Sequence, residues 1–162
     1  MCVFAACAVG AHAAQAPGKA AVFGFRLLDT SAFSTPTTNR AEKARLAMLD
    51  SLLRQRLQAA GYQLVSTAPL ATQISEQDML NCAVCAPDFA RRLGADVSII
   101  GWVEKVSNLI LNVNLVMRDA RTGKIERAGS VSIRSNTDES WTRGLDYLLV
   151  ERILPTAEAI PQ

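Results

Sequence analysis

The chain has 162 residues, of which 49% are hydrophobic and 20% charged; this is the composition of one folded domain and excludes a disordered chain. No apolar run reaches about 18 residues, so we expect no transmembrane helix, and a net charge of +2 gives no support to nucleic-acid binding. The single histidine, His12, lies in an N-terminal segment that we expect to be removed, which excludes His-dependent triads and His-rich metal sites in the mature chain.

The N-terminal segment predicts secretion. Residues 1–16 are small and apolar, without an acidic or basic side chain, and 11–13 (Ala-His-Ala) fit the small-x-small pattern before a signal-peptidase cut. We therefore expect a signal-peptide remnant at 1–13, a single globular domain at 14–162 and a periplasmic location. The alternative is the frayed apolar end of a cytosolic protein.

Two features of this segment differ from an ordinary signal peptide. It carries no Lys or Arg after Met1, and its apolar stretch is short; a start codon upstream of Met1 would explain both. Cys7 follows Phe-Ala-Ala, which is a poor lipobox, and too few residues precede it for a signal. We therefore do not expect the protein to be a lipoprotein.

The first half of the chain predicts a strand, a long helix and a second strand. Residues 19–29 carry apolar side chains on both faces, which is typical of a buried strand, and the Ser-, Thr- and Pro-rich residues 30–39 predict a loop. Residues 40–60 predict a helix whose apolar stripe consists of Leu46, Leu49, Leu53, Leu57 and Ala60. Asp50 and Arg54 are expected to pair on another face of it. A strand at 62–66 then predicts a right-handed crossover between parallel strands.

The second half predicts a short helix, three strands and a final helix. Residues 67–81 are polar and ambiguous, and Pro87 opens a helix over 87–93. Strands are expected at 96–107, 108–118 and 125–134, the last two joined as a hairpin by the turn at 119–124.

The last helix is expected to begin after Asn136, with Glu139 completing a capping box. Its apolar face consists of Trp141, Leu145, Leu148, Leu149 and Ile153. The order strand-helix-strand-(helix)-strand-strand-strand-helix predicts an α/β (α+β) fold, with a mixed five-stranded sheet and helices packed on it.

Cys82 and Cys85 form the sharpest motif, a CxxC pair. This spacing occurs in disulfides, in redox-active pairs and in halves of zinc sites. No second cysteine pair and no histidine remain in the mature chain to complete a zinc site, so we expect no metal and no cofactor, a dimer-bridging site being the remaining route. The leading interpretation is a structural disulfide in an oxidising compartment. The alternative is a redox pair, since Cys85 lies near a helix start that would stabilise a thiolate.

Two further groups are candidate binding residues. In the predicted hairpin, Asn112, Asn114, Ser132 and Arg134 fall on one sheet face opposite an apolar face, where they could bind a peptide, a glycan or an anionic group. A solvated sheet face is the simpler interpretation. Asp29, Thr30 and Ser31 follow the first strand at the end where open α/β sheets bind ligands, although no Gly-rich phosphate loop follows and a turn or cap would also explain them.

Three segments resemble a family of small secreted bacterial proteins of unknown function: AVFGFRLLDTS at 21–31, FARRLGADVSIIGWVEKVSNLILNVNLVMRD at 89–119 and NTDESWTRGLDYLL at 136–149. The CxxC pair fits this family as well. The resemblance implies no catalytic residues, because the family has no assigned activity. In element order the chain is more distantly similar to the amino-terminal domain of TolB and to the periplasmic domain of the curli-secretion lipoprotein, which are interaction modules of the cell envelope.

Together these observations favour a binding protein over an enzyme. We predict a non-enzymatic periplasmic accessory or interaction module whose partner is another envelope protein, bound at the sheet face or edge. The alternative is a redox-active or redox-sensing envelope protein that uses Cys82 and Cys85. A small-ligand binder at Asp29 is a third hypothesis. The sequence leaves the partner, the pathway and the oligomeric state open.

Overall fold

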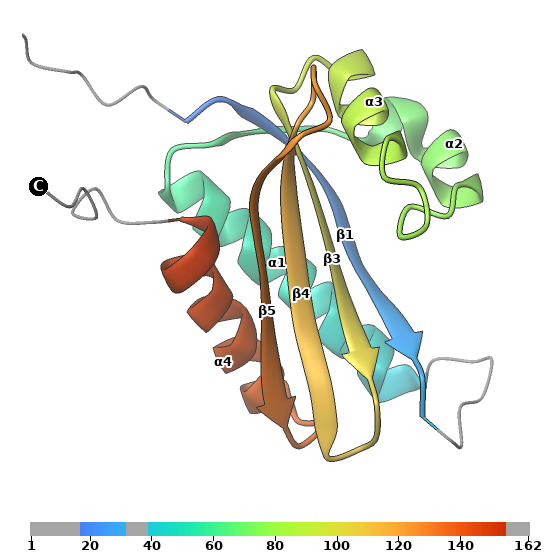
Figure 1. The fold of residues 1–162 in the computed structure, drawn as a ribbon, viewed down its shortest axis with the longest axis vertical. Helices are drawn as coiled ribbons and strands as arrows, with labels where there is room; N and C mark the ends of the chain where they lie inside the picture. The colour runs from blue at the N-terminus through green and yellow to red at the C-terminus, as the bar shows by residue number, and fades with distance from the viewer. Residues whose placement is uncertain (1–16, 32–38, 155–162) are drawn as a thin grey trace, which may run out of the picture.

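A computed structural model describes residues 17–31 and 39–154; the predicted cleavage site and Cys7 lie outside these residues. The strands form one mixed sheet in the order β2-β1-β3-β4-β5 (Figure 1). β1 pairs in parallel with β2 and β3, and the β3–β4 and β4–β5 pairs are antiparallel. The bounds of the strands are Lys19–Asp29, Gln63–Val65, Val97–Lys105, Ile110–Asp119 and Ile125–Arg134. The predicted five-stranded mixed sheet is confirmed.

The helices divide between the two faces of the sheet. α1 (Arg40–Ala59) and α4 (Asp138–Leu148), which continues into the π-helical turn η2 (Leu149–Ile153), pack on one face. Figure 1 shows α1 behind the strands, and α2 and α3 at the upper end of the sheet. The upper group packs on the second face and consists of η1 (Ala68–Leu70), α2 (Ala71–Glu76) and α3 (Cys85–Arg92). We call the rest of this second face the open face.

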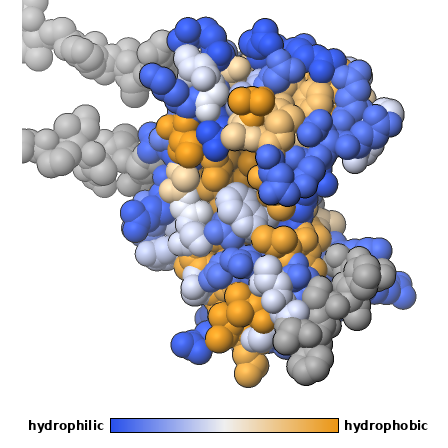
Figure 2. Space-filling view, turned by 45° about the vertical axis from the view of Figure 1, so that its right-hand side comes forward, coloured by the Kyte–Doolittle hydropathy of each residue, from blue (hydrophilic) through white to orange (hydrophobic). Residues whose placement is uncertain are grey.

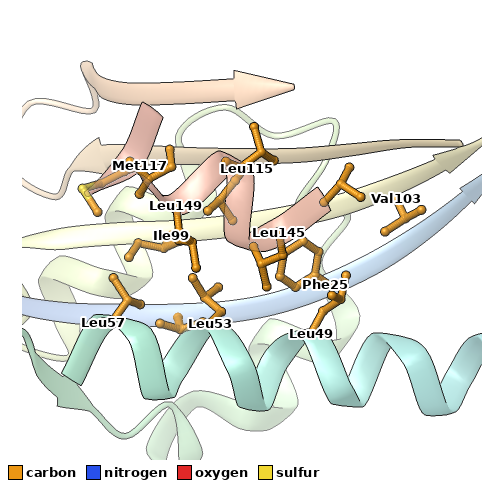
Figure 3. Close-up of a cluster of buried hydrophobic side chains, with 14 of the residues drawn as sticks. Phe25, Leu49, Leu53, Leu57, Ile99, Val103, Leu115, Met117, Leu145 and Leu149 are labelled. Carbon is orange, nitrogen blue, oxygen red and sulfur yellow. The ribbon is translucent and has the colours of Figure 1, made fainter. Parts of the chain in front are cut away.

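The main core lies between the sheet and the pair α1 and α4 (Figure 3). The apolar stripes predicted for both helices point into it, and the fully buried members are Leu49, Leu53, Leu57, Trp141, Leu145, Leu148, Leu149 and Ile153. Ala60, predicted to end the first stripe, is instead exposed at the C-terminal cap of α1.

A bulge in β1 is closed by two side chains of α1. Gly24 adopts a φ of 82°, which favours glycine, and the β1–β3 register shifts between Val22 and Phe25. The Phe25 N–H donates to Asp50 Oδ1 at 2.7 Å, and Arg54 Nη2 donates to the Val22 carbonyl at 3.0 Å. The sequence pairs Asp50 with Arg54; in the structure both side chains bind the backbone of β1, and the charge of Arg54 remains close enough to act on Asp50. Burial raises the pKa of Asp50, and the Phe25 N–H opposes this rise.

The N-terminal cap of α4 lies one residue later than predicted. The Thr137 side chain accepts a hydrogen bond from the Ser140 N–H, and the Ser140 hydroxyl accepts one from the Thr137 N–H. The predicted cap of Asn136 and Glu139 is therefore wrong. Asn136 Oδ1 instead accepts a hydrogen bond from the indole N–H of the buried Trp141 at 3.0 Å.

Candidate functional site

The open face carries a row of hydrogen-bonded polar side chains across three strands. Glu104 of β3 lies opposite Asn112 of β4, which lies opposite Ser132 of β5. Asn112 Nδ2 donates to Glu104 Oε2 at 3.3 Å, and Ser132 Oγ donates to Asn112 Oδ1 at 2.6 Å. We call these three residues the polar row. The sequence predicted the neighbours Asn112 and Ser132 but missed Glu104, which the alternation along β3 could have indicated.

Asn114 occupies the next position on this face but is not part of the accessible surface. It is only 8% exposed, contrary to the exposure expected from the sequence. Its amide donates to the Asn112 carbonyl at 3.1 Å and to the Trp102 carbonyl at 3.5 Å. Because these contacts bind backbone groups of β3 and β4, Asn114 supports the sheet.

Exposed apolar side chains lie at the lower end of the open face. Leu28 lies opposite Glu104 in the β1–β3 register, and Ile110 lies opposite the exposed Arg134. With the β3–β4 turn they form what we call the apolar end, which consists of Leu28, Val106, Leu109 and Ile110, each 42–69% exposed. Figure 2 shows hydrophobic side chains at the bottom of the molecule, where Figure 1 places this turn. The polar row thus borders an exposed apolar surface.

The Cys82–Cys85 disulfide lies at the opposite, upper end of the open face. The two Cα atoms are 5.4 Å apart, and α3 begins at Cys85 rather than at the predicted Pro87. Cys82 lines a cavity of about 110 Å³ together with Ile100, Trp102 and other residues. Whether the pair is structural or redox-active stays a prediction.

The predicted ligand loop, Asp29 to Ser31, is a turn held by hydrogen bonds within the turn and to β3. Asp29 Oδ1 accepts hydrogen bonds from the Ser31 N–H at 3.0 Å and from the Ser31 hydroxyl at 2.6 Å. The Thr30 N–H donates to the Lys105 carbonyl at 2.9 Å. The hydrogen bond from the Ser31 hydroxyl lowers the pKa of Asp29 although burial opposes it. This geometry matches the turn interpretation, and a ligand role stays a prediction.

Sequence reasoning missed a buried ionic network beneath this turn. Lys105 Nζ lies 2.8 Å from Glu42 Oε1 and 3.5 Å from Asp29 Oδ2, and Asn136 Nδ2 donates to Glu42 Oε1 at 2.9 Å. Burial opposes the ionisation of Glu42, but the hydrogen bonds from Lys105 and Asn136 outweigh it and lower its pKa. The bond to Glu42 raises the pKa of Lys105. The odd position of Lys105 on the core-facing side of β3 is the feature that could have indicated this network.

Within residues 17–31 and 39–154, no group of three His, Cys, Asp or Glu side chains is arranged to hold a metal ion. None of the helices described is both long enough and apolar enough to cross a membrane.

Solved structures share this fold at low sequence identity. The LpoB C-terminal domain from Escherichia coli matches with a TM-score of 0.53 and 20% identity, covering 77% of this chain and 88% of that one. Lipoprotein GNA1162 from Neisseria meningitidis matches with a TM-score of 0.50 and 22% identity, covering 75% of this chain and 84% of that one. The PelC dodecamer from Paraburkholderia phytofirmans matches with a TM-score of 0.50 and 14% identity, covering 82% of this chain and 85% of that one. At these identities the likeness establishes the fold alone.

The comparisons bear on three expectations from the sequence. Because GNA1162 is a lipoprotein with this fold, the expectation against lipidation at Cys7 gains no support. The likeness to TolB and to the curli-secretion lipoprotein stays a prediction. No curated protein matches the chain. The model of the family DUF3280, described as "Protein of unknown function (DUF2380)", matches residues 18–153, which include every strand and helix described above, and the chain therefore belongs to this family.

Proposed function

We propose that the protein is a non-enzymatic accessory protein of the periplasm that binds another envelope protein through its open face. The observation that carries this proposal is the polar row lying beside the apolar end. Lipoprotein GNA1162 has the same fold, which supports an envelope location.

The chemistry of the surface suits recognition. Asn112 and Ser132 are short side chains already held by hydrogen bonds, so ordering them against a partner costs little conformational entropy. Leu109 is 69% exposed and supplies apolar area that a partner can remove from water. A binding surface that combines an apolar anchor with a satisfied polar border is typical of protein interfaces.

The test compares three single variants in affinity capture from envelope extracts of the source bacterium. Asn112→Lys places bulk and charge in the polar row, Leu109→Ser removes apolar area from the apolar end, and Gln58→Lys adds a charge at an exposed position of α1, away from the open face. We expect a set of captured proteins that Gln58→Lys retains and that both other variants lose, with all four proteins unfolding at similar temperatures. Equal capture by the wild type and by both open-face variants would overturn the proposal.

A thiol–disulfide role is the second candidate, because Cys85 is the first residue of α3, where helix N–H groups stabilise a thiolate. Equilibration of the native protein in glutathione redox buffers separates the two candidates. A disulfide that is reduced at the potentials of known thiol oxidoreductases supports the redox role. A disulfide that stays oxidised until the protein unfolds rejects it.

A further inference from the structure

β5 is a long strand with an open hydrogen-bonding edge. It is ten residues long. Among the described strands it ends the order and pairs with β4 alone (Figure 1). In the described part of the chain, no side chain or loop donates to or accepts from its backbone. The opposite edge strand, β2, has only three residues. Natural sheets protect such edges with proline, charged side chains, bulges or short strands. In β5 the charged side chains and the irregularity lie toward the two ends, and residues 128–133 contain no proline and no charge.

We propose that β5 pairs antiparallel with β5 of a second copy of this chain, around a twofold axis at Ser130. Ala128, Ser130, Ser132 and Arg134 pair with open-face residues of β4. Glu126 is the next residue in this alternation; it lies at the β4–β5 irregularity and has no Cα partner on β4. With Ser130 opposite Ser130, Glu126 of each copy faces Arg134 of the other. Opposite charges at such cross-strand positions stabilise a ladder. The side chains between them on this face, Ala128 and Ser132, are small and raise no steric obstacle.

The neighbouring registers that keep the same faces together are less favourable. Moving the axis to Gly129 sets Arg134 against Lys124 of the second copy, which brings like charges together. Moving the axis to Val131 places Arg134 opposite Ala128 of the second copy. Glu126 then lies beyond the end of the second copy's β5 and has no charged partner. An axis placed between two residues would change the pairing by one position and bring opposite faces together, so such registers are excluded. Among the registers that remain, the charges select the axis at Ser130.

α4 and η2 supply a second contact beside this edge. α4 approaches Ile133 at Gly144, where an added Cβ would lie 2.7 Å from the Ile133 side chain, and η2 approaches Gly129 at Arg152. Tyr147 lines a hollow together with Val131, Ile133 and Arg134 of β5 and is 50% exposed. Neighbouring strands lie about 4.8 Å apart, so the second copy brings its own α4 beside this flank. The pairing therefore covers the exposed aromatic side chain of Tyr147 as well as the strand edge.

Engineered disulfides test the position of the axis. In the full chain with Cys2→Ser and Cys7→Ser, the variant Ser130→Cys sets two thiols opposite each other at Cα separations of about 5 Å, within disulfide range. The matched control Ser132→Cys, also exposed on the same strand, sets its two thiols about 14 Å apart along the ladder. Mild oxidation should link Ser130→Cys into dimers and leave Ser132→Cys largely unlinked. Equal linking of the two variants, or none of Ser130→Cys, overturns the proposed axis.

Charge exchange tests the pairing without cysteine. Glu126→Arg and Arg134→Glu should each weaken dimerisation about tenfold in analytical ultracentrifugation, since each sets like charges opposite each other twice. The double variant should return the affinity to that of the wild type, and Glu76→Arg on the exposed surface of α2 should leave it unchanged. A wild-type monomer at millimolar concentration, or a dimer insensitive to both exchanges, overturns the proposal. If the wild type is a monomer, the edge of β5 remains available to pair with a strand of another protein.

This inference stands apart from the proposed function. Asn112→Lys and Leu109→Ser report on capture of another protein, whereas Ser130→Cys and Glu126→Arg report on self-association. Either proposal can therefore fail while the other holds.

Discussion

The ammonium group of Lys105 lies 2.8 Å from the Glu42 carboxylate, with the Glu42 side chain 2% and the Lys105 side chain 12% exposed. The pair joins the end of β3 to the first turn of α1, and Asn136 extends it to the segment before α4. Three elements distant in sequence thus meet at one ion pair. An ion pair with so little water around it is costly to break on one side only, because the remaining charge stays buried.

Lys105→Met should destabilise the protein by about 3–5 kcal/mol at pH 7, because it leaves Glu42 charged and without its cation. The double variant Glu42→Gln with Lys105→Met should lose much less, since no buried charge remains. Denaturant unfolding of the two variants and the wild type measures this. A loss below about 1 kcal/mol for the single variant would show that water reaches Glu42.

Lys105→Met should also reverse the effect of acid on the stability that Glu42 contributes. In the wild type the folded-state pKa values of Glu42 and Asp29 are lowered, so their contribution to stability is complete above the unfolded-state pKa values and is lost as the pH falls through the folded-state values. In Lys105→Met burial dominates and raises the pKa of Glu42, so acid removes part of the penalty. The stability difference between the two proteins should shrink from pH 7 to pH 4. A constant difference would contradict this assignment.

Asn112 and Asn114 should differ in their tolerance of lysine. Asn112→Lys should change the free energy of unfolding by no more than about 0.5 kcal/mol, as is usual at solvent-facing positions. Asn114→Lys should cost about 1–3 kcal/mol, because Asn114 is buried and its amide binds two backbone carbonyls. Thermal unfolding of both variants provides the comparison. Equal losses would mean that the two side chains share one environment.

Replacing Cys82 and Cys85 by serine should cost at most about 2 kcal/mol, since closing so short a loop removes little entropy from the unfolded chain. The far-ultraviolet circular dichroism should stay unchanged. Mass spectrometry after alkylation without reductant tests the bond itself. Full labelling of both thiols in freshly prepared periplasm would show that the disulfide does not form in the cell.

Gly101→Ala should destabilise the protein by about 1–3 kcal/mol through overpacking. Gly101 lies beside Phe25 in the β1–β3 ladder, and an added Cβ would overlap the Phe25 ring. Adding Phe25→Leu should recover part of the loss, because the smaller side chain leaves room for the methyl group. Denaturant unfolding measures both variants, and no recovery would place the strain elsewhere.

The sequence sufficed for those parts of the fold that depend on periodic patterns. Leu49, Leu53 and Leu57 repeat at helical spacing, and alternation assigned Asn112 and Ser132 to one face of the hairpin; each assignment depends only on residues near in sequence. The parallel pairing of β1 with β2 followed from the crossover rule.

The errors arise where a side chain binds an element distant in sequence. Asp50 and Arg54 have ideal spacing for a helical ion pair, but the β1 bulge offers them backbone partners that only the tertiary structure reveals. Asn136 is a good capping residue, yet Trp141 and Glu42 engage its amide. The exposure of Asn114 depends on packing around it, which alternation along a strand does not encode.

The bulge at Gly24 makes one amide a reporter of helix docking. The Phe25 N–H donates to a carboxylate of α1, so its protection from hydrogen exchange requires α1 to be in place. Other β1 amides can keep their ladder partners while α1 moves away. Exchange at Phe25 therefore follows the detachment of α1 from the sheet, and comparing it with exchange at central β3 amides separates that partial opening from global unfolding.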